Sequence, residues 1–143
     1  AGSGFHRDAR RFEVATSCLP LFAGLGTSLQ LLEEEGDVAS RCGAIRARSR
    51  QLWEGLQSIP GVRTLLSEPP PAGLVSFQLV STALQGEEGR RDPQSIVAEL
   101  GEQRIWLRTL ADPPCVRACT HLTTTEEEVE RLLEALRAIA ARP

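Results

Sequence analysis

The sequence contains no lysine, and all 16 of its basic residues are arginine. No side-chain amine is therefore available to form a Schiff base with a carbonyl compound, so this chain alone cannot perform chemistry that starts with one. No apolar run approaches the roughly 18 residues that a membrane-spanning helix needs, and we expect no signal peptide. The formal net charge of -3 argues against a surface that binds nucleic acid.

The four cysteines, Cys18, Cys42, Cys115 and Cys119, do not follow the spacing of secreted disulfide-rich domains. We therefore expect reduced thiols in a cytoplasmic protein. The pattern Cys115-x-x-x-Cys119 with His121 nearby offers no fourth ligand, so it predicts no metal site. A chain of 143 residues that is 41% hydrophobic and 24% charged is typical of one soluble globular domain.

Two stretches early in the chain have apolar residues at steps of three and four, which predicts helices over residues 19–35 and 38–58. The apolar stripe of the second helix includes Cys42, which we interpret as a small core residue. A hydroxyl cap from Thr16 or Ser17 would begin the first helix.

The starts of two later helices are indicated by their capping residues. Asp92 is a typical N-cap because a proline follows it, and Gly101 is expected to end that helix. Thr124 and Glu127 have the spacing of a capping box, which predicts the start of an amphipathic helix that runs toward the end of the chain.

Four short segments have the alternation or the flanking turns of strands: residues 62–66, 74–80, 105–109 and 115–119. The resulting order is helix, helix, strand, strand, helix, strand, strand, helix. Long helices with few strands favour an α+β fold, in which a small, mainly antiparallel sheet is covered by helices on one face.

The last two strands each present one arginine, Arg108 and Arg117. A guanidinium is a rigid, planar and permanently charged group that can donate two hydrogen bonds to one carboxylate. Two guanidiniums on neighbouring strands would form a binding site for a small carboxylate. The alternative is that each arginine is a solvated strand residue of no special role, and spacing alone leaves both interpretations open.

Two segments resemble the class V aminotransferase group of fold-type I pyridoxal-phosphate enzymes, which includes cysteine desulfurases and cysteine/cystine lyases. The first runs from Arg117 to Val129 and matches the group's arginine, threonine and paired glutamates before a terminal helix. The second, RFEVAT at residues 11–16, matches the group's R-[FY]-E-x-[GA]-T segment. Further similarity to cyanobacterial cysteine/cystine C-S lyases lies in RRFEVATS, PLFAGL, QLWEGL, IPGV and GLVSFQL, which together span nearly the whole chain.

This resemblance implies that residues 19–143 are the C-terminal small domain of a fold-type I enzyme, led in by a long helix. Residues 1–18 would be a segment packed on the cofactor domain. The Schiff-base lysine would lie in that missing N-terminal domain, which makes the domain an expected partner of this chain. The full enzyme would be a homodimer with pyridoxal 5'-phosphate. This chain alone would bind no cofactor and have no activity.

The resemblance also assigns roles to three residues. Arg117 would bind the substrate α-carboxylate, and Arg108 would contact the second end of a sulfur amino acid such as cystine. Thr16 would lie near the cofactor phosphate, as an alternative to its role as a helix cap. The reaction implied is β-elimination, which releases pyruvate, ammonia and sulfide or persulfide.

Two other functions stay open. A cysteine desulfurase would need a nucleophilic cysteine on a loop about 15 residues before Arg117, where this sequence has Glu102. Cys115, in a strand, is expected to be an inert buried thiol. The remaining alternative is a non-catalytic α+β module that binds a small ligand or another protein, with the arginine pair as a regulatory amino-acid site.

Overall fold

The computed structural model describes residues 4, 6–12, 18–80 and 89–142. The chain divides into two compact units, Ala1–Gly36 and Asp37–Pro143. None of the described helices is long and apolar enough to cross a membrane. The proposed division between residues 18 and 19 concerns packing on another domain, so it stays a prediction.

The first unit contains a short 3-10 helix, η1 (Ala9–Phe12), and the helix α1 (Leu19–Glu34). Cys18 occupies the N-cap position of α1, and its side chain makes no capping hydrogen bond. The predicted cap by Thr16 or Ser17 is therefore wrong, and both residues lie outside the described part of the chain. No residue of α1 is buried, although the helix is rich in leucine.

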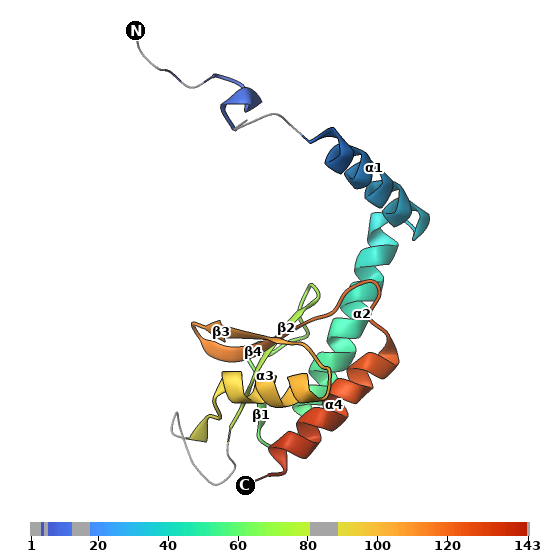
Figure 1. Ribbon diagram of the computed structural model, residues 1–143. Helices are drawn as coiled ribbons and strands as arrows, with labels where there is room; N and C mark the ends of the chain where they lie inside the picture. Colours follow the sequence, from blue (N-terminus) through green and yellow to red (C-terminus); the bar gives the residue numbers. More distant parts are fainter. Residues whose placement is uncertain (1–3, 5, 13–17, 81–88, 143) are drawn as a thin grey trace. The chain divides into compact units, whose positions relative to one another are not determined.

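The second unit holds the rest of the fold in the predicted order (Figure 1). Its elements are α2 (Val38–Gln57), β1 (Val62–Thr64), β2 (Leu74–Leu79), α3 (Pro93–Glu102), β3 (Arg108–Ala111), β4 (Pro114–Cys119) and α4 (Glu126–Ala140). The four strands form one sheet in the order β1-β2-β4-β3, and every neighbouring pair is antiparallel.

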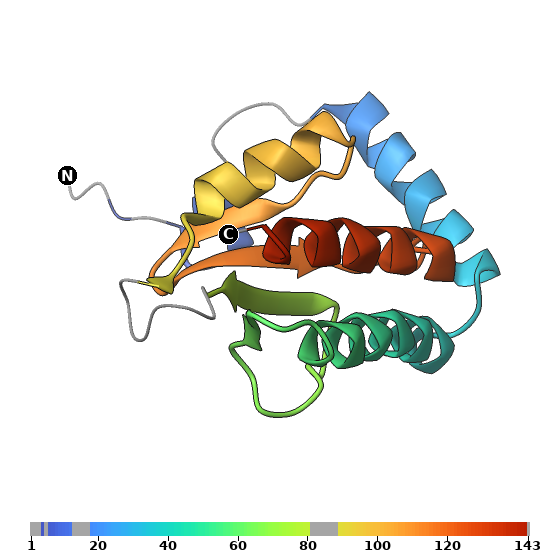
Figure 2. The same cartoon turned by 90° about the horizontal axis from the view of Figure 1, so that it is seen from below.

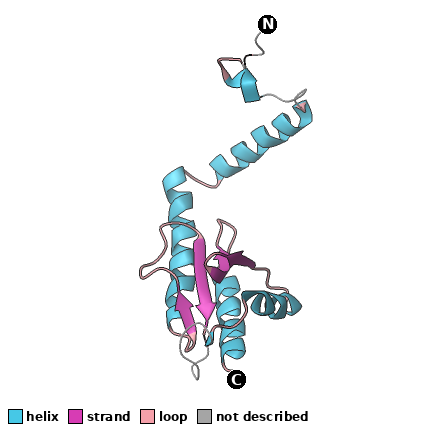
Figure 3. Ribbon diagram, turned by 90° about the vertical axis from the view of Figure 1, so that its left-hand side faces the viewer, coloured by secondary structure: helices cyan, strands magenta, loops and turns pink. Residues whose placement is uncertain are grey.

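The three helices α2, α3 and α4 cover one face of this sheet, where Figure 2 shows them side by side. Figure 3 shows strands in front of α2 and α4. Alternate residues of β2 and β4, such as Phe77 and Val116, are fully buried beneath the helices. None of the described helices of this unit lies on the opposite face of the sheet. The predicted α+β fold with a small antiparallel sheet is confirmed.

Helix α2 packs on the core only through its second half, where Leu52 and Leu56 are buried. Cys42 lies in the first half and is exposed, so its assignment to the core is wrong. The apolar periodicity was real, but the first turns of α2 extend beyond the part of the helix that meets the core.

Helix α3 begins as predicted, because Asp92 accepts a hydrogen bond from the Ser95 N–H at 2.9 Å. It does not end at Gly101 but continues to Glu102. Gly101 instead makes room for the ring of Trp106, which a Cβ at this glycine would approach to 3.3 Å.

The capping box of α4 lies one residue later than predicted, and joins Thr125 with Glu128 rather than Thr124 with Glu127. The run of three threonines and three glutamates offers this pattern in more than one register. The hydroxyl of Thr124 instead accepts a hydrogen bond from the His121 N–H at 2.8 Å.

Strand β3 begins at Arg108, three residues later than the predicted strand at residues 105–109. Ile105 and Leu107 do pack against the core. Their alternation therefore reflected contact with the core and not a hydrogen-bonded ladder. Because β3 pairs with β4 from Arg108↔Arg117 to Ala111↔Pro114, the tight turn at residues 112–113 fixes which residues belong to the strand.

Candidate functional site

The two arginines predicted as a carboxylate receptor lie directly opposite each other in the register of β3 and β4. Side chains of a paired position in an antiparallel sheet point to the same face. Val116 and Ala118 flank Arg117 in β4 and are buried under the helices, so both arginines lie on the opposite face of the sheet. Arg117 is half-buried and Arg108 is exposed.

Neither guanidinium has a hydrogen-bond or carboxylate partner among the residues that the structure describes. Like charges at directly opposite positions of two strands destabilise the sheet. An anion placed between Arg108 and Arg117 would attract both guanidiniums and so offset their mutual repulsion. The geometry is therefore suited to binding a small carboxylate beside this pair of arginines.

A third residue, Ser76, extends this row, because β2 pairs Ser76 with Arg117. Its hydroxyl lies on the same face as the two guanidiniums and is both a donor and an acceptor. Sequence reasoning did not select Ser76 as a site residue. The available signal was its position on the polar side of the alternation in β2.

Gln78 is buried on the same face, with 3% of its surface exposed. Its Oε1 accepts a hydrogen bond from Arg63 Nη2 at 2.6 Å, and its Nε2 donates to the carbonyl of Pro114 at 2.7 Å. These bonds join β1, β2 and the first residue of β4. Gln78 thus holds the start of the hairpin that carries Arg108 and Arg117.

Cys115 is fully buried, and its neighbours include Ser76 and Arg117. Burial raises the pKa of the Cys115 thiol, while the hydrogen bond with Ser76 and the charge of Arg117 act in the opposite direction. The thiol is therefore protonated at neutral pH and has little nucleophilic character.

The position at which a desulfurase would carry its nucleophile does not lie on a loop. Glu102 is the last residue of α3, and the connection from β3 to β4 is a tight turn. Thr16, predicted to lie near a cofactor phosphate, falls outside the described residues. Within residues 4, 6–12, 18–80 and 89–142, no three or more His, Cys, Asp or Glu residues lie together as possible metal ligands.

Comparison with known proteins gives the family of the chain and the structures that share its fold. The sequence matches the family named aminotransferase class-V over residues 1–132. No curated protein matches the chain. Among solved structures, a complex of the cystine C-S lyase C-DES with its reaction product cysteine persulfide is 44% identical, with a TM-score of 0.80. The similarity covers 96% of this chain and 34% of C-DES.

A C-DES mutant, K223A, with glycine covalently linked to its pyridoxal-phosphate cofactor shows the same identity and TM-score. The apo cysteine desulfurase of Thermococcus onnurineus NA1 is 23% identical with a TM-score of 0.73, covering 92% of this chain and 34% of that one. The desulfurase shares the fold. In each comparison this chain spans about a third of the other protein's length.

Proposed function

This chain belongs to the aminotransferase class-V family, and we propose that it supplies the carboxylate-binding part of a pyridoxal-phosphate-dependent cysteine/cystine C-S lyase. The chain spans about a third of the C-DES structures, so the activity of a whole enzyme is part of the proposal. In this proposal residues 19–143 are the small domain of that enzyme. Residues 1–18 pack on a cofactor domain, and Thr16 lies near the cofactor phosphate.

The cross-strand pair of Arg108 and Arg117 is the observation that carries this proposal. Cystine has two carboxylates, and the two guanidiniums on one sheet face could bind one carboxylate each. Arg117, which is half-buried, is suited to the α-carboxylate at the reacting end, because a less hydrated charge binds more tightly. Arg108 is exposed and is suited to the distal end of the substrate.

The described residues do not fit pyridoxal phosphate by themselves, because the chain has no lysine for the Schiff base. The cofactor, held by the remainder of the enzyme, would supply the electron sink for loss of the Cα proton. The contribution of this chain is to fix the substrate carboxylate so that the Cα–H bond has one orientation. The overall change converts cystine and water into pyruvate, ammonia and cysteine persulfide.

The test is a fusion in which this chain replaces the matching C-terminal third of C-DES, assayed for pyruvate released from cystine. We expect activity in the fusion and none in the chain alone. Arg117→Ala should lower kcat/KM for cystine by about 100-fold or more, because a charge-assisted bidentate contact is lost. Arg108→Ala should have a smaller effect, chiefly on KM.

Arg137→Ala is the matched control, because Arg137 is exposed on α4 and lies outside the proposed site. Each variant should retain the absorbance of bound cofactor, which separates loss of substrate binding from loss of folding. A fusion that binds cofactor but gives equal kcat/KM with and without Arg117 would refute the proposed role.

The desulfurase alternative is less well supported, because Glu102 occupies the position of the nucleophile and Cys115 is buried and protonated. In the fusion, Cys115→Ser should leave pyruvate release from cystine unchanged. Loss of sulfur transfer in that variant would favour the desulfurase instead. A fusion without cofactor absorbance or pyruvate release would favour a non-catalytic binding module.

A further inference from the structure

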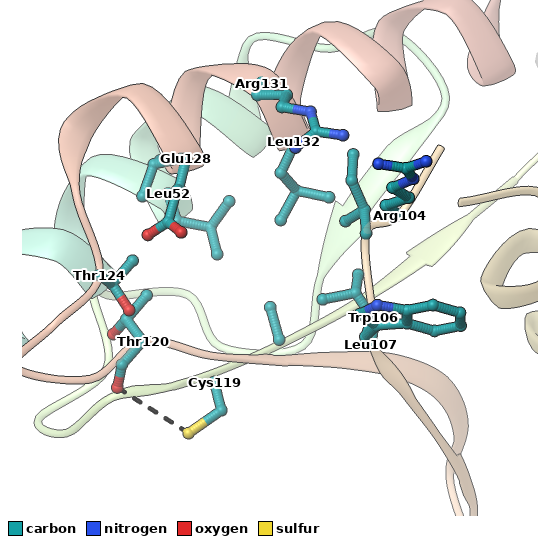
Figure 4. Close-up of a pocket in the computed structure, with 13 residues that line it drawn as sticks. Leu52, Arg104, Trp106, Leu107, Cys119, Thr120, Thr124, Glu128, Arg131 and Leu132 are labelled. Carbon is teal, nitrogen blue, oxygen red and sulfur yellow. Dashed lines mark hydrogen bonds between the residues drawn. The ribbon is translucent and has the colours of Figure 1, made fainter. Parts of the chain in front are cut away.

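A separate cavity of about 290 Å³ lies between residues 104–107, the end of β4 and the start of α4 (Figure 4). The cavity exists because β3 does not begin until Arg108. Residues 104–107 therefore do not pair with the last residues of β4, and the gap leads toward the core. Arg108 and Arg117 do not line this space, so it is not the arginine pair described above.

The wall of the cavity is largely apolar, with Leu52, Leu107 and Leu132 among its lining residues. Charge is confined to its ends. Figure 4 shows the guanidiniums of Arg104 and Arg131 on one side, and the carboxylate of Glu128 on the other.

Arg104 has an unusual backbone conformation, with a φ of 59°. It follows α3 at the position where a left-handed residue closes the helix: its N–H donates to the Gly101 carbonyl, and the next N–H donates to the Leu100 carbonyl. Glycine is the favoured residue there, because a side chain in this region is strained. Helix termination therefore does not explain an arginine at this position.

The guanidinium of Arg104 has no ion-pair or hydrogen-bond partner in the part of the chain that the structure describes. Arg131 Nη2 donates to the carbonyl of Gln103, which holds the second guanidinium beside the same turn. The two charges lie at one end of an apolar cavity. Glu128 at the other end is already engaged in the capping box, where it accepts a hydrogen bond from the Thr125 N–H.

We propose that this cavity binds a small organic anion with an apolar body, whose carboxylate lies between Arg104 and Arg131 and whose body lies against Leu107 and Leu132. The apolar wall favours a hydrocarbon or aromatic group over a compact polar ion. The charge at the rim favours an acid over a neutral compound. This site is independent of the proposed C-S lyase function, because neither Arg108 nor Arg117 lines the cavity.

Phenylacetate is a suitable probe, added to the 143-residue chain and followed by the two indole N–H signals in NMR spectra. Trp106 lines the cavity, whereas Trp53 donates its indole N–H to the Leu66 carbonyl and serves as an internal reference. We expect phenylacetate to shift the Trp106 signal with a Kd of about 1 mM or tighter, and to leave the Trp53 signal in place.

Arg104→Gly is the decisive variant, because it removes the guanidinium while replacing a strained residue with the one that this turn favours. It should weaken phenylacetate binding at least about tenfold and raise the urea midpoint of unfolding, so loss of binding cannot result from loss of folding. Arg131→Gln should also weaken binding. Arg137→Gln, an exposed arginine on the same helix, should leave the Kd unchanged.

Two further probes separate the charge from the apolar body. The neutral analogue 2-phenylethanol should bind at least about tenfold more weakly than phenylacetate, and inorganic phosphate should not shift the Trp106 signal. The proposal is overturned if phenylacetate leaves Trp106 unshifted, if Arg104→Gly binds as tightly as the wild type, or if phosphate and phenylacetate bind equally well.

Discussion

Gln78→Leu tests whether one buried amide holds the strand hairpin of the candidate site. The side chain of Gln78 is 3% exposed and forms hydrogen bonds to Arg63 and to the carbonyl of Pro114. Leucine has nearly the same volume but can form neither bond. The substitution therefore removes the links between β1, β2 and β4 without creating a large cavity.

The expected loss follows from the two bonds and their surroundings. Each hydrogen bond contributes about 1 kcal/mol net, and the half-buried Pro114 carbonyl left without its partner costs about 1 kcal/mol more. Burial of the leucine side chain offsets about 1 kcal/mol. We therefore expect the free energy of unfolding to fall by about 2 kcal/mol.

Urea unfolding followed by circular dichroism measures this change. With a slope of about 2 kcal/mol per M, the midpoint should move down by about 1 M. Gln94→Leu is the matched control, because Gln94 is exposed on α3, and its midpoint should stay within about 0.3 M of the wild type. A Gln78→Leu midpoint equal to that of the control would show that the amide network contributes nothing to the hairpin.

Three further predictions concern capping, pH and thiol reactivity. Thr125→Ala should destabilise the chain by about 1 kcal/mol through loss of the capping box. Thr123→Ala should have no measurable effect in the same urea assay. Equal effects of the two variants would contradict the assignment of Thr125 as the capping residue. The pKa of Asp37 is lowered by hydrogen bonds from the backbone and side chain of Ser40. The ionised Asp37 cap therefore stabilises the fold at pH values above the ordinary aspartate pKa, and this stabilisation is lost as the pH falls through the lowered pKa of Asp37. The urea midpoint of Asp37→Asn should consequently depend less on pH between 7 and 3 than that of the wild type. Iodoacetamide should alkylate exposed Cys18, Cys42 and Cys119 at least about tenfold faster than buried Cys115. Peptide mass spectrometry would measure these rates. Equally fast labelling of Cys115 would show that its thiol is not inert.

Local patterns were sufficient for the helices and for the fold class. The step of three and four residues located α1 and α2 to within a residue or two, because an amphipathic helix repeats the same contact every turn. The cap at Asp92 was identified from two adjacent residues, since the interaction is itself local. The same reasoning failed for Cys42, because the periodicity does not reveal where along a helix the core ends.

Where several local solutions were equivalent, the surrounding structure selected one. The threonine and glutamate run permits more than one capping box. In the structure Thr125 and Glu128 form the box, while the Thr124 hydroxyl accepts a hydrogen bond from the His121 N–H. The alternation at residues 105–109 fits a strand, but pairing with β4 begins only at Arg108. That late start also leaves the cavity beside Arg104, which no pattern in the sequence indicated.

The sequence by itself determined the helical periods, the order of helices and strands along the chain and the lack of a side-chain amine for a Schiff base, since each depends on residue types or near neighbours along the chain. Only the tertiary structure decided that Arg108 and Arg117 face each other, that Ser76 joins their row and that Gln78 ties the hairpin in place. The physical reason is that strand register depends on turns and on core contacts between distant segments, and a shift of one residue would have moved either arginine to the buried face.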